Sequence, residues 1–216
     1  KRINYCIIGK NNTYILKKMN ERNGIMFSKK SRVHIEDKNA IILLQRLIYK
    51  QMLKLNYTGT GNNIIILCVG TDRSTGDSLG PLTGSYLKKY KHLPIQTIGD
   101  IDNPVHASNL DKTIKKIQKN YSSPFIIAVD AGLGKKSSVG YIDVKKGPLK
   151  PGTGVNKDLT EIGDMHITGL VNVGGYMEYL VLQSTRLSIV IKMAEVIAGG
   201  LEKTISAVVK EKSVID

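Results

Sequence analysis

An apolar run that ends in a glycine-rich loop is the feature that most constrains the fold of this chain. Residues 64–69 read IIILCV, and the loop from Gly70 to Pro81 reads GTDRSTGDSLGP. A continuous run of β-branched and aliphatic residues is typical of a strand buried on both faces, as in parallel sheets. A glycine-rich loop after such a strand commonly cradles a phosphate, but this loop has Asp77 where a phosphate loop would carry lysine. The loop therefore predicts a crevice that presents a carboxylate.

Strands and helices alternate along the chain. Apolar runs predict strands at 64–69, 94–98, 125–129 and 166–171, a short strand at 3–8 and an antiparallel addition at 139–144. Helical spacing predicts helices at 38–55 (capped by Asp37), 79–90, 102–118 and 175–198, a helical turn at 158–162, and an interruption at Gly199-Gly200 before 201–210. This alternation predicts an α/β sheet with helices on both faces.

The length of 216 residues predicts a single domain over 1–216, divided into an N-terminal extension with one helix (1–60) and a core (62–216). The two cysteines, Cys6 and Cys68, lie in apolar runs and are expected to be reduced core residues. The apolar stretch near the first residue is too short for a signal peptide, and no segment is apolar enough to span a membrane. We therefore expect a cytoplasmic protein without a membrane partner.

The formal net charge is +14, which raises the question of nucleic-acid binding. The lysines fall in pairs spread along the chain, without interleaved aromatic residues and without a nucleic-acid motif. We therefore expect solvated helix surfaces and no specific nucleic acid, although this charge attracts acidic partners at long range. No HExxH motif or His/Cys cluster is present, so we expect neither a bound metal nor a cofactor.

In α/β sheets of this kind, ligands bind beyond the carboxyl ends of the strands. Polar residues gather in the segments that follow three predicted strands, and we expect Asp77 and Asp130 to be catalytic. A further glycine-rich stretch, GPLKPGTGV, spans 147–155 and would present backbone groups to a bound peptide. The residues expected to bind substrate are Arg73, Asp102, His106, Gly132, Gly152, Thr153 and Gly154.

Each of the two aspartates also has a simpler explanation. Asp77 could cap the following helix, and Asp130 could cap the turn at a strand end. His106 and His166 could be structural histidines. Together, however, two carboxylates in one crevice resist double ionisation, so one pKa should rise and the other stay low. Such a pair supplies an acid and a base for the attack of water on a peptide carbonyl.

Four motifs carry a family resemblance: GTDRSTGDSLGP, PFIIAVDAGLG, GPLKPGTGV and HITGLVNVGGYMEYLVLQSTRLS. In this order they resemble the YyaC-type sporulation proteins over about residues 62–200. The outline is more distantly similar to the spore germination protease family, atypical aspartic peptidases that degrade small acid-soluble spore proteins. It also resembles the hydrogenase maturation endopeptidases, which use two acidic residues and a histidine to engage a metal in their substrate. The acidic positions of both families map onto Asp77 and Asp130, and His166 is the nearest histidine in order.

The resemblance implies a three-layer α/β/α sandwich of the phosphorylase/hydrolase-like type, with a mostly parallel central sheet. It implies a sporulation or germination endopeptidase with a paired-Asp site that acts on a spore or sporulation protein, such as the small acid-soluble spore proteins, inside the forespore or spore. A homo-oligomer is left open. Two alternatives remain: a catalytically inactive relative that binds a peptide or protein, and a metal-dependent hydrolase that uses Asp77 and Asp130 with His106 or His166.

Overall fold

The computed structural model describes residues 31–57, 63–151 and 160–212, with side chains to residue 209. The described residues all belong to one compact unit, 31–216. The predicted strand at 3–8, Cys6 and the glycine-rich residues 152–154 lie outside the described residues. In the described part of the chain, no helix is long and apolar enough to cross a membrane.

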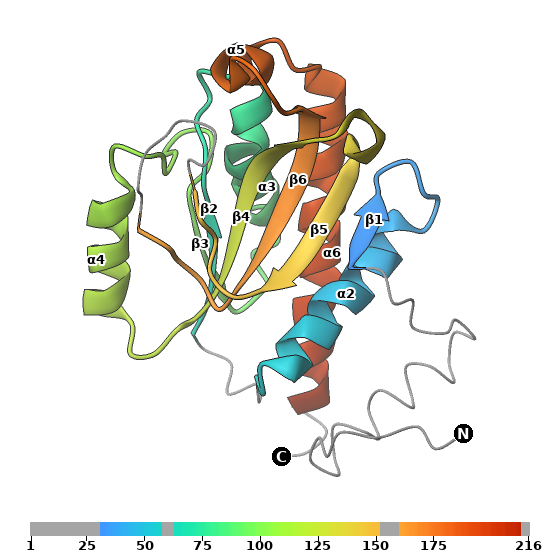
Figure 1. Ribbon diagram of the computed structural model, residues 1–216. Helices are drawn as coiled ribbons and strands as arrows, with labels where there is room; N and C mark the ends of the chain where they lie inside the picture. Colours follow the sequence, from blue (N-terminus) through green and yellow to red (C-terminus); the bar gives the residue numbers. More distant parts are fainter. Residues whose placement is uncertain (1–30, 58–62, 152–159, 213–216) are drawn as a thin grey trace, which may run out of the picture. The chain divides into compact units, whose positions relative to one another are not determined.

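A six-stranded sheet forms the centre of the unit (Figure 1). Its strands are β1 (Arg32–His34), β2 (Ile64–Cys68), β3 (Ile95–Ile98), β4 (Phe125–Gly134), β5 (Tyr141–Lys146) and β6 (Met165–Val173). They lie in the order β1-β5-β6-β4-β2-β3. Four neighbours, β3, β2, β4 and β6, are parallel, whereas β5 runs antiparallel to β6 and β1 runs antiparallel to β5.

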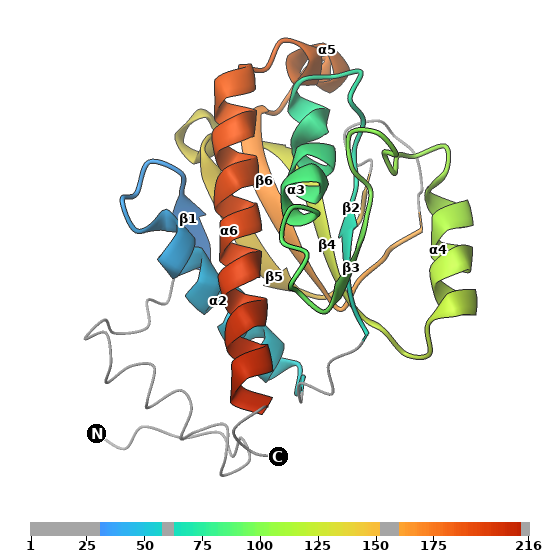
Figure 2. The same ribbon diagram turned by 180° about the vertical axis from the view of Figure 1, so that it is seen from behind.

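Helices cover both faces of this sheet (Figure 2). They are α2 (Ala40–Lys54), α3 (Leu79–Leu87), α4 (Leu110–Asn120), α5 (Glu178–Gln183) and α6 (Leu187–Lys212). Ile66 of β2 packs in one buried cluster with residues of α2, α3 and α6. Its neighbour Leu67 packs in a second cluster with residues of α4. This alternation of buried residues within one strand confirms the α/β/α layering expected from the sequence.

The connections around β2 and β4 create a topological switch point. The chain leaves β2 through α3 to reach β3 on one side, whereas it leaves β4 through β5 to reach β6 on the other side. Because these connections diverge, a crevice opens at the carboxyl ends of the two strands. The β2–β4 pairing runs from Ile64 opposite Phe125 to Cys68 opposite Val129, so both strands end at the same edge.

The helix predicted at 102–118 begins later than expected, at Leu110. The preceding segment is a loop in which the Asp100 side chain accepts a hydrogen bond from the Asn103 N–H at 2.8 Å. Val105 forms a parallel bridge with Val69, which extends the edge of the sheet. These contacts hold the segment outside helical geometry, so the residues around His106 remain at the carboxyl edge.

The predicted helix over 175–198 is also wrong, because the structure divides it into α5 and α6. Thr185, which lies between the two helices, donates to the Val181 carbonyl and accepts from the Asn172 amide of β6. The predicted interruption at Gly199-Gly200 is wrong as well, because α6 continues through both glycines. A Cβ at Gly200 would lie 2.9 Å from Leu44 Cδ2 of α2, so glycine allows the two helices to pack closely here.

Three smaller expectations also change. Residues 130–134, expected as a loop, continue β4 because β6 pairs with them up to Gly134. Residues 160–162 are not helical, and Ile162 instead bridges Leu149. Asp37 does not cap α2: its carboxylate accepts from the Asn39 N–H at 2.8 Å, and Asn39 is the residue that precedes the helix.

Candidate functional site

A cleft of about 560 Å³ lies at the switch point between β2 and β4. Of the residues expected at the site, five line this cleft: Arg73, Asp77, His106, Asp130 and Gly132. Asp102 is exposed and does not line the cleft, because the loop that carries it projects it towards solvent. Pro151 contributes to the wall and marks the point where the described residues stop before 152–154.

The loop after β2 holds Asp77 through backbone contacts. Residues Gly76–Ser78 form a short 3₁₀ turn, and the Thr71 N–H donates to the Asp77 carbonyl oxygen at 3.2 Å. Helix α3 follows immediately, and a Cβ at Gly80 would overlap the Val69 carbonyl. Only glycine therefore allows α3 to begin this close to the end of β2. Ser78, not Asp77, occupies the capping position of α3, so the Asp77 side chain is available to the cleft.

Asp130 lies within β4, and its residue is only 9% exposed. Its Oδ1 accepts a hydrogen bond from the Ala131 N–H at 2.8 Å. Among the described residues, no cation forms an ion pair with it. Burial, and then the negative charge of Asp77, raise the pKa of Asp130 well above its ordinary value, and the Ala131 N–H only partly offsets this rise. The two carboxyl groups therefore interact electrostatically across the cleft.

Asp77 is half-buried, and its neighbours shift its pKa in opposite directions. Burial raises the pKa of Asp77, whereas a hydrogen bond from the Thr71 backbone and the positive charge of His106 oppose that rise. In the part of the chain that the structure describes, Asp130 has no such charge to assist its ionisation. As pH rises, Asp77 should therefore ionise before Asp130, which leaves one carboxylate and one neutral acid side by side.

His106 lies in the loop before α4. Its N–H donates to Asn109 Oδ1 at 2.9 Å, and its Nδ1 accepts from the Ser108 N–H at 3.3 Å. His166, in contrast, lies on β6, where its Nδ1 contacts the Gly147 carbonyl oxygen at 2.9 Å, and it does not line the cleft.

Sequence reasoning missed two parts of the cleft wall. Ser74 is 6% exposed and lines the cleft, and its hydroxyl has no hydrogen-bond partner among the described residues. Glu178, Tyr179 and Leu182 of α5 form another part of the wall. Gly174 and Gly175 were the only sequence signal for the wall formed by α5, because they mark a change of chain direction after β6. In the described residues, no three His, Cys, Asp or Glu side chains are grouped as a metal site.

Comparisons with known proteins place this architecture in a family. The chain is 47% identical over 189 residues to "Uncharacterized protein YyaC" of Bacillus subtilis (strain 168), which covers 86% of this chain and 90% of that protein. The NiFe hydrogenase maturation protease HycI from Thermococcus kodakarensis KOD1 is structurally similar with a TM-score of 0.46 and 17% identity, over 71% of this chain and 99% of that one. The family model described as "Protein of unknown function (DUF1256)" matches residues 32–200. The resemblance to YyaC-type proteins is thereby confirmed, and the chain belongs to the DUF1256 family.

Proposed function

We propose that the cleft is the active site of an endopeptidase in which Asp77 and Asp130 act as base and acid. One observation carries this proposal: Asp130 is buried beside a second carboxylate, in a cleft at the switch point of the sheet, and among the described residues no cation is paired with it. A buried charge that lacks a partner is costly, and such groups are concentrated at functional sites. The opposing effects of Thr71 and His106 on Asp77 support the assignment of the two roles.

The chemistry follows from these protonation states. The Asp77 carboxylate accepts a proton from a water molecule as the water oxygen attacks the peptide carbonyl carbon. Neutral Asp130 donates its proton to the carbonyl oxygen, which gives an uncharged gem-diol. When the C–N bond breaks, Asp77 gives its proton to the leaving nitrogen, and Asp130 takes a proton from the diol. Both aspartates thereby return to their starting states, and each contributes about 10²–10⁴-fold to the rate.

We further propose that the substrate is a protein of the spore or of sporulation, with small acid-soluble spore proteins as the first candidates, and that the enzyme works in the forespore or spore interior. The four motifs of the sequence support this choice through their resemblance to sporulation proteins and to the spore germination protease family. Arg73 at the exposed rim and the backbone at Gly132 are the groups expected to position the substrate.

The test is a cleavage assay with purified full-length protein and small acid-soluble spore proteins, analysed by mass spectrometry. We expect discrete fragments from the wild type and none from Asp77→Asn, because the amide cannot accept the proton of water. Asp72→Asn is the matched control: it makes the same chemical change on the same loop, but Asp72 is exposed and does not line the cleft.

Fragments that persist at the wild-type rate in Asp77→Asn would reject the proposed base. Binding of the spore proteins without any cleavage would instead favour a catalytically inactive relative. Cleavage that stops with a chelator and returns with an added divalent ion would favour a metal-dependent hydrolase.

A further inference from the structure

A second hollow, of about 580 Å³, lies between the edge strand β3 and helix α4. It is a groove rather than part of the cleft, although His106 lines both and joins them. Its lining includes Thr97 on the strand side and Asn109, Thr113, Lys116 and Asn120 on the helix side. Neither the candidate catalytic pair nor the family resemblance accounts for this groove.

One wall of the groove is an open edge of the sheet. β3 is the last strand in the order, and among the described residues it pairs only with β2 (Figure 2). An edge strand presents unpaired N–H and C=O groups along its free side. Thr97 and Ile98 of this strand and Gly99, which follows it, line the groove. The groove therefore offers backbone hydrogen bonds to another extended chain, which is how many proteins bind peptides by strand addition.

The other wall is a polar stripe on α4. Leu110, Ile114 and Ile117 are buried, and they pack α4 against the sheet. Asn109, Thr113, Lys116 and Asn120 follow one another at intervals of three or four residues and line the groove beside this apolar side. Helix positions with this spacing share a face. The wall that faces the edge strand therefore presents the polar side chains of Thr113 and Asn120 and the cation of Lys116. The Asn109 amide is already engaged by the His106 N–H and the Pro104 carbonyl.

The groove carries more unbalanced positive charge than negative charge. Asp100 is 2% exposed and is neutralised by an ion pair with Lys88. Lys116 is exposed and has no acidic partner among the described residues. The neighbouring lysines of α4 and the net charge of +14 add to the positive potential. An acidic side chain that enters the groove therefore gains attraction without competition from a local carboxylate.

We propose that this groove binds an extended, acidic segment of a polypeptide, which adds to β3 as a strand and leads past His106 into the cleft. This polypeptide is a substrate only if the proposed peptidase function holds. A single-stranded nucleic acid fits the groove less well, because it would require aromatic platforms for its bases. Apart from His106, Tyr121 is the only aromatic residue among those that line the groove.

The binding test uses a fluorescent peptide of about ten residues in which glutamate and threonine alternate, a pattern suited to an added strand. Full-length protein carrying Asp77→Asn serves as the background, so that cleavage cannot consume the probe. Lys116→Glu should weaken binding at least about fivefold at low ionic strength, and less at higher salt. Lys119→Glu is the matched control, because it makes the same charge reversal on an exposed α4 position outside the groove, and it should change binding less than about twofold.

Two further probes separate strand addition from simple charge attraction. A peptide with the same charges but N-methyl groups at alternate residues should bind at least about tenfold more weakly, because it cannot donate its hydrogen bonds to an edge strand. The parent peptide should slow hydrogen exchange at the β3 amides. Equal binding of the methylated peptide, equal effects of the two lysine variants, or tighter binding of an oligothymidylate would each overturn the proposal.

These experiments also distinguish a failure of the groove proposal from a failure of the peptidase proposal. If the peptide binds as described but the wild type cleaves no spore protein, the groove stands and the peptidase proposal fails. If the wild type cleaves but Lys116→Glu alters neither KM nor peptide binding, the groove proposal fails and the peptidase proposal stands.

Discussion

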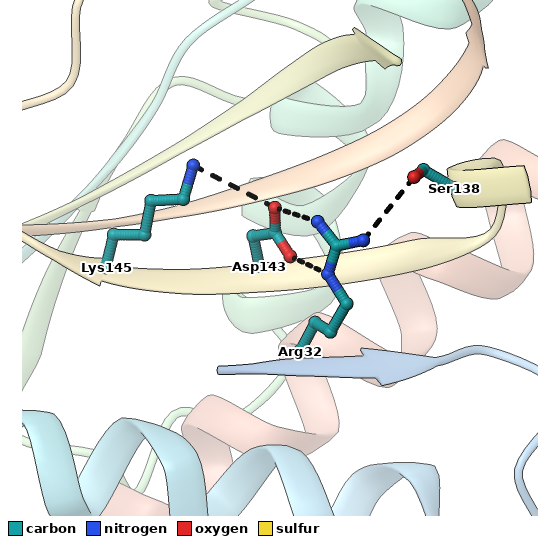
Figure 3. Close-up of polar contacts among 4 residues, drawn as sticks. All are labelled: Arg32, Ser138, Asp143 and Lys145. Atoms are coloured by element: carbon teal, nitrogen blue, oxygen red, sulfur yellow. Dashed lines mark hydrogen bonds and ion pairs between the residues drawn. The ribbon is translucent and has the colours of Figure 1, made fainter. Parts of the chain in front are cut away.

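Two aspartates of the same sheet, Asp143 on β5 and Asp130 on β4, are buried to a similar degree but face different neighbours. Asp143 is 5% exposed and receives Nε and Nη2 of Arg32 at 2.9 and 3.0 Å (Figure 3). Lys145 Nζ lies 3.9 Å from the same carboxylate, and Arg32 also reaches the Ser138 hydroxyl. Asp130 has a single backbone donor and faces a second carboxylate.

The difference shows how one residue type serves two purposes. Arg32 and Asp143 are opposed partners in the β1–β5 ladder, so their two-pronged ion pair fastens the short edge strand β1 to the sheet. That carboxylate is held by two charge-assisted hydrogen bonds and does not line the cleft. Asp130 is held in place by the sheet, but among the described residues no cation is paired with it to favour its charged form, so it holds a proton that it can exchange with a ligand in the cleft.

The largest expected effect is on catalysis. Asp130→Asn should reduce kcat on the cleaved spore protein about 10²–10⁴-fold, because the amide cannot donate the proton that neutral Asp130 supplies. Asp143→Asn should leave kcat unchanged, since its carboxylate lies outside the cleft. Rates measured under saturating substrate would test both. A comparable loss of kcat in the two variants would show that Asp130 has no role in catalysis beyond the structural role of Asp143.

The next effect is on stability. Asp143→Asn should lower the free energy of unfolding by about 1–3 kcal/mol, because it leaves the Arg32 guanidinium without its carboxylate. The value is below that of a fully buried pair because the Arg32 side chain is 37% exposed. Urea denaturation provides the measurement. Lys145→Met is the control and should cost less than about 0.5 kcal/mol, because Lys145 is exposed and more distant; equal losses would contradict a specific role for Arg32.

The smallest expected effect is a gain in the free energy of unfolding rather than a loss. Burial and Asp77 raise the folded-state pKa of Asp130 above its unfolded value, so the folded protein loses stability as pH rises through that interval. Asp130→Asn removes this loss while its side-chain oxygen still accepts from Ala131. We expect a gain of roughly 0.5–2 kcal/mol at neutral pH that vanishes below about pH 4, where the unfolded aspartate is protonated. Thermal unfolding across this pH range checks it, and a gain independent of pH would contradict the stated cause.

The sequence was sufficient for the features that depend on local pattern. The continuous apolar runs that became β2 and β4 predicted central parallel strands, and parallel strands carry Asp77 and Asp130 to one edge. The catalytic and binding roles of these residues stay predictions. Local pattern was also enough to expect helices on both faces of the sheet, because each apolar strand needs cover on both sides.

Features set by distant contacts could not be predicted in this way. The extension of β4 depends on pairing with β6, and the late start of α4 depends on the bridge between Val69 and Val105. The division between α5 and α6 depends on the contact of Asn172 with Thr185. Because these partners are remote in sequence or in a different element, helical spacing alone favoured longer helices. The contribution of α5 to the cleft was missed for this reason.

The close packing of α3 on the strand ends also bears on how this sequence can vary. A Cβ at Gly80 would overlap the Val69 carbonyl, and one at Gly84 would overlap the Gly99 carbonyl, so both obstacles are backbone atoms that no side-chain rearrangement can remove. Substitution at either position must shift α3 and, with it, the turn that carries Asp77. In a library of random variants, these two positions should therefore retain glycine, whereas exposed Asp72 and Arg73 a few residues earlier should accept many residue types without loss of fold. The part of the loop that touches the sheet is constrained by backbone geometry, whereas any constraint on its exposed residues must come from function rather than from the fold.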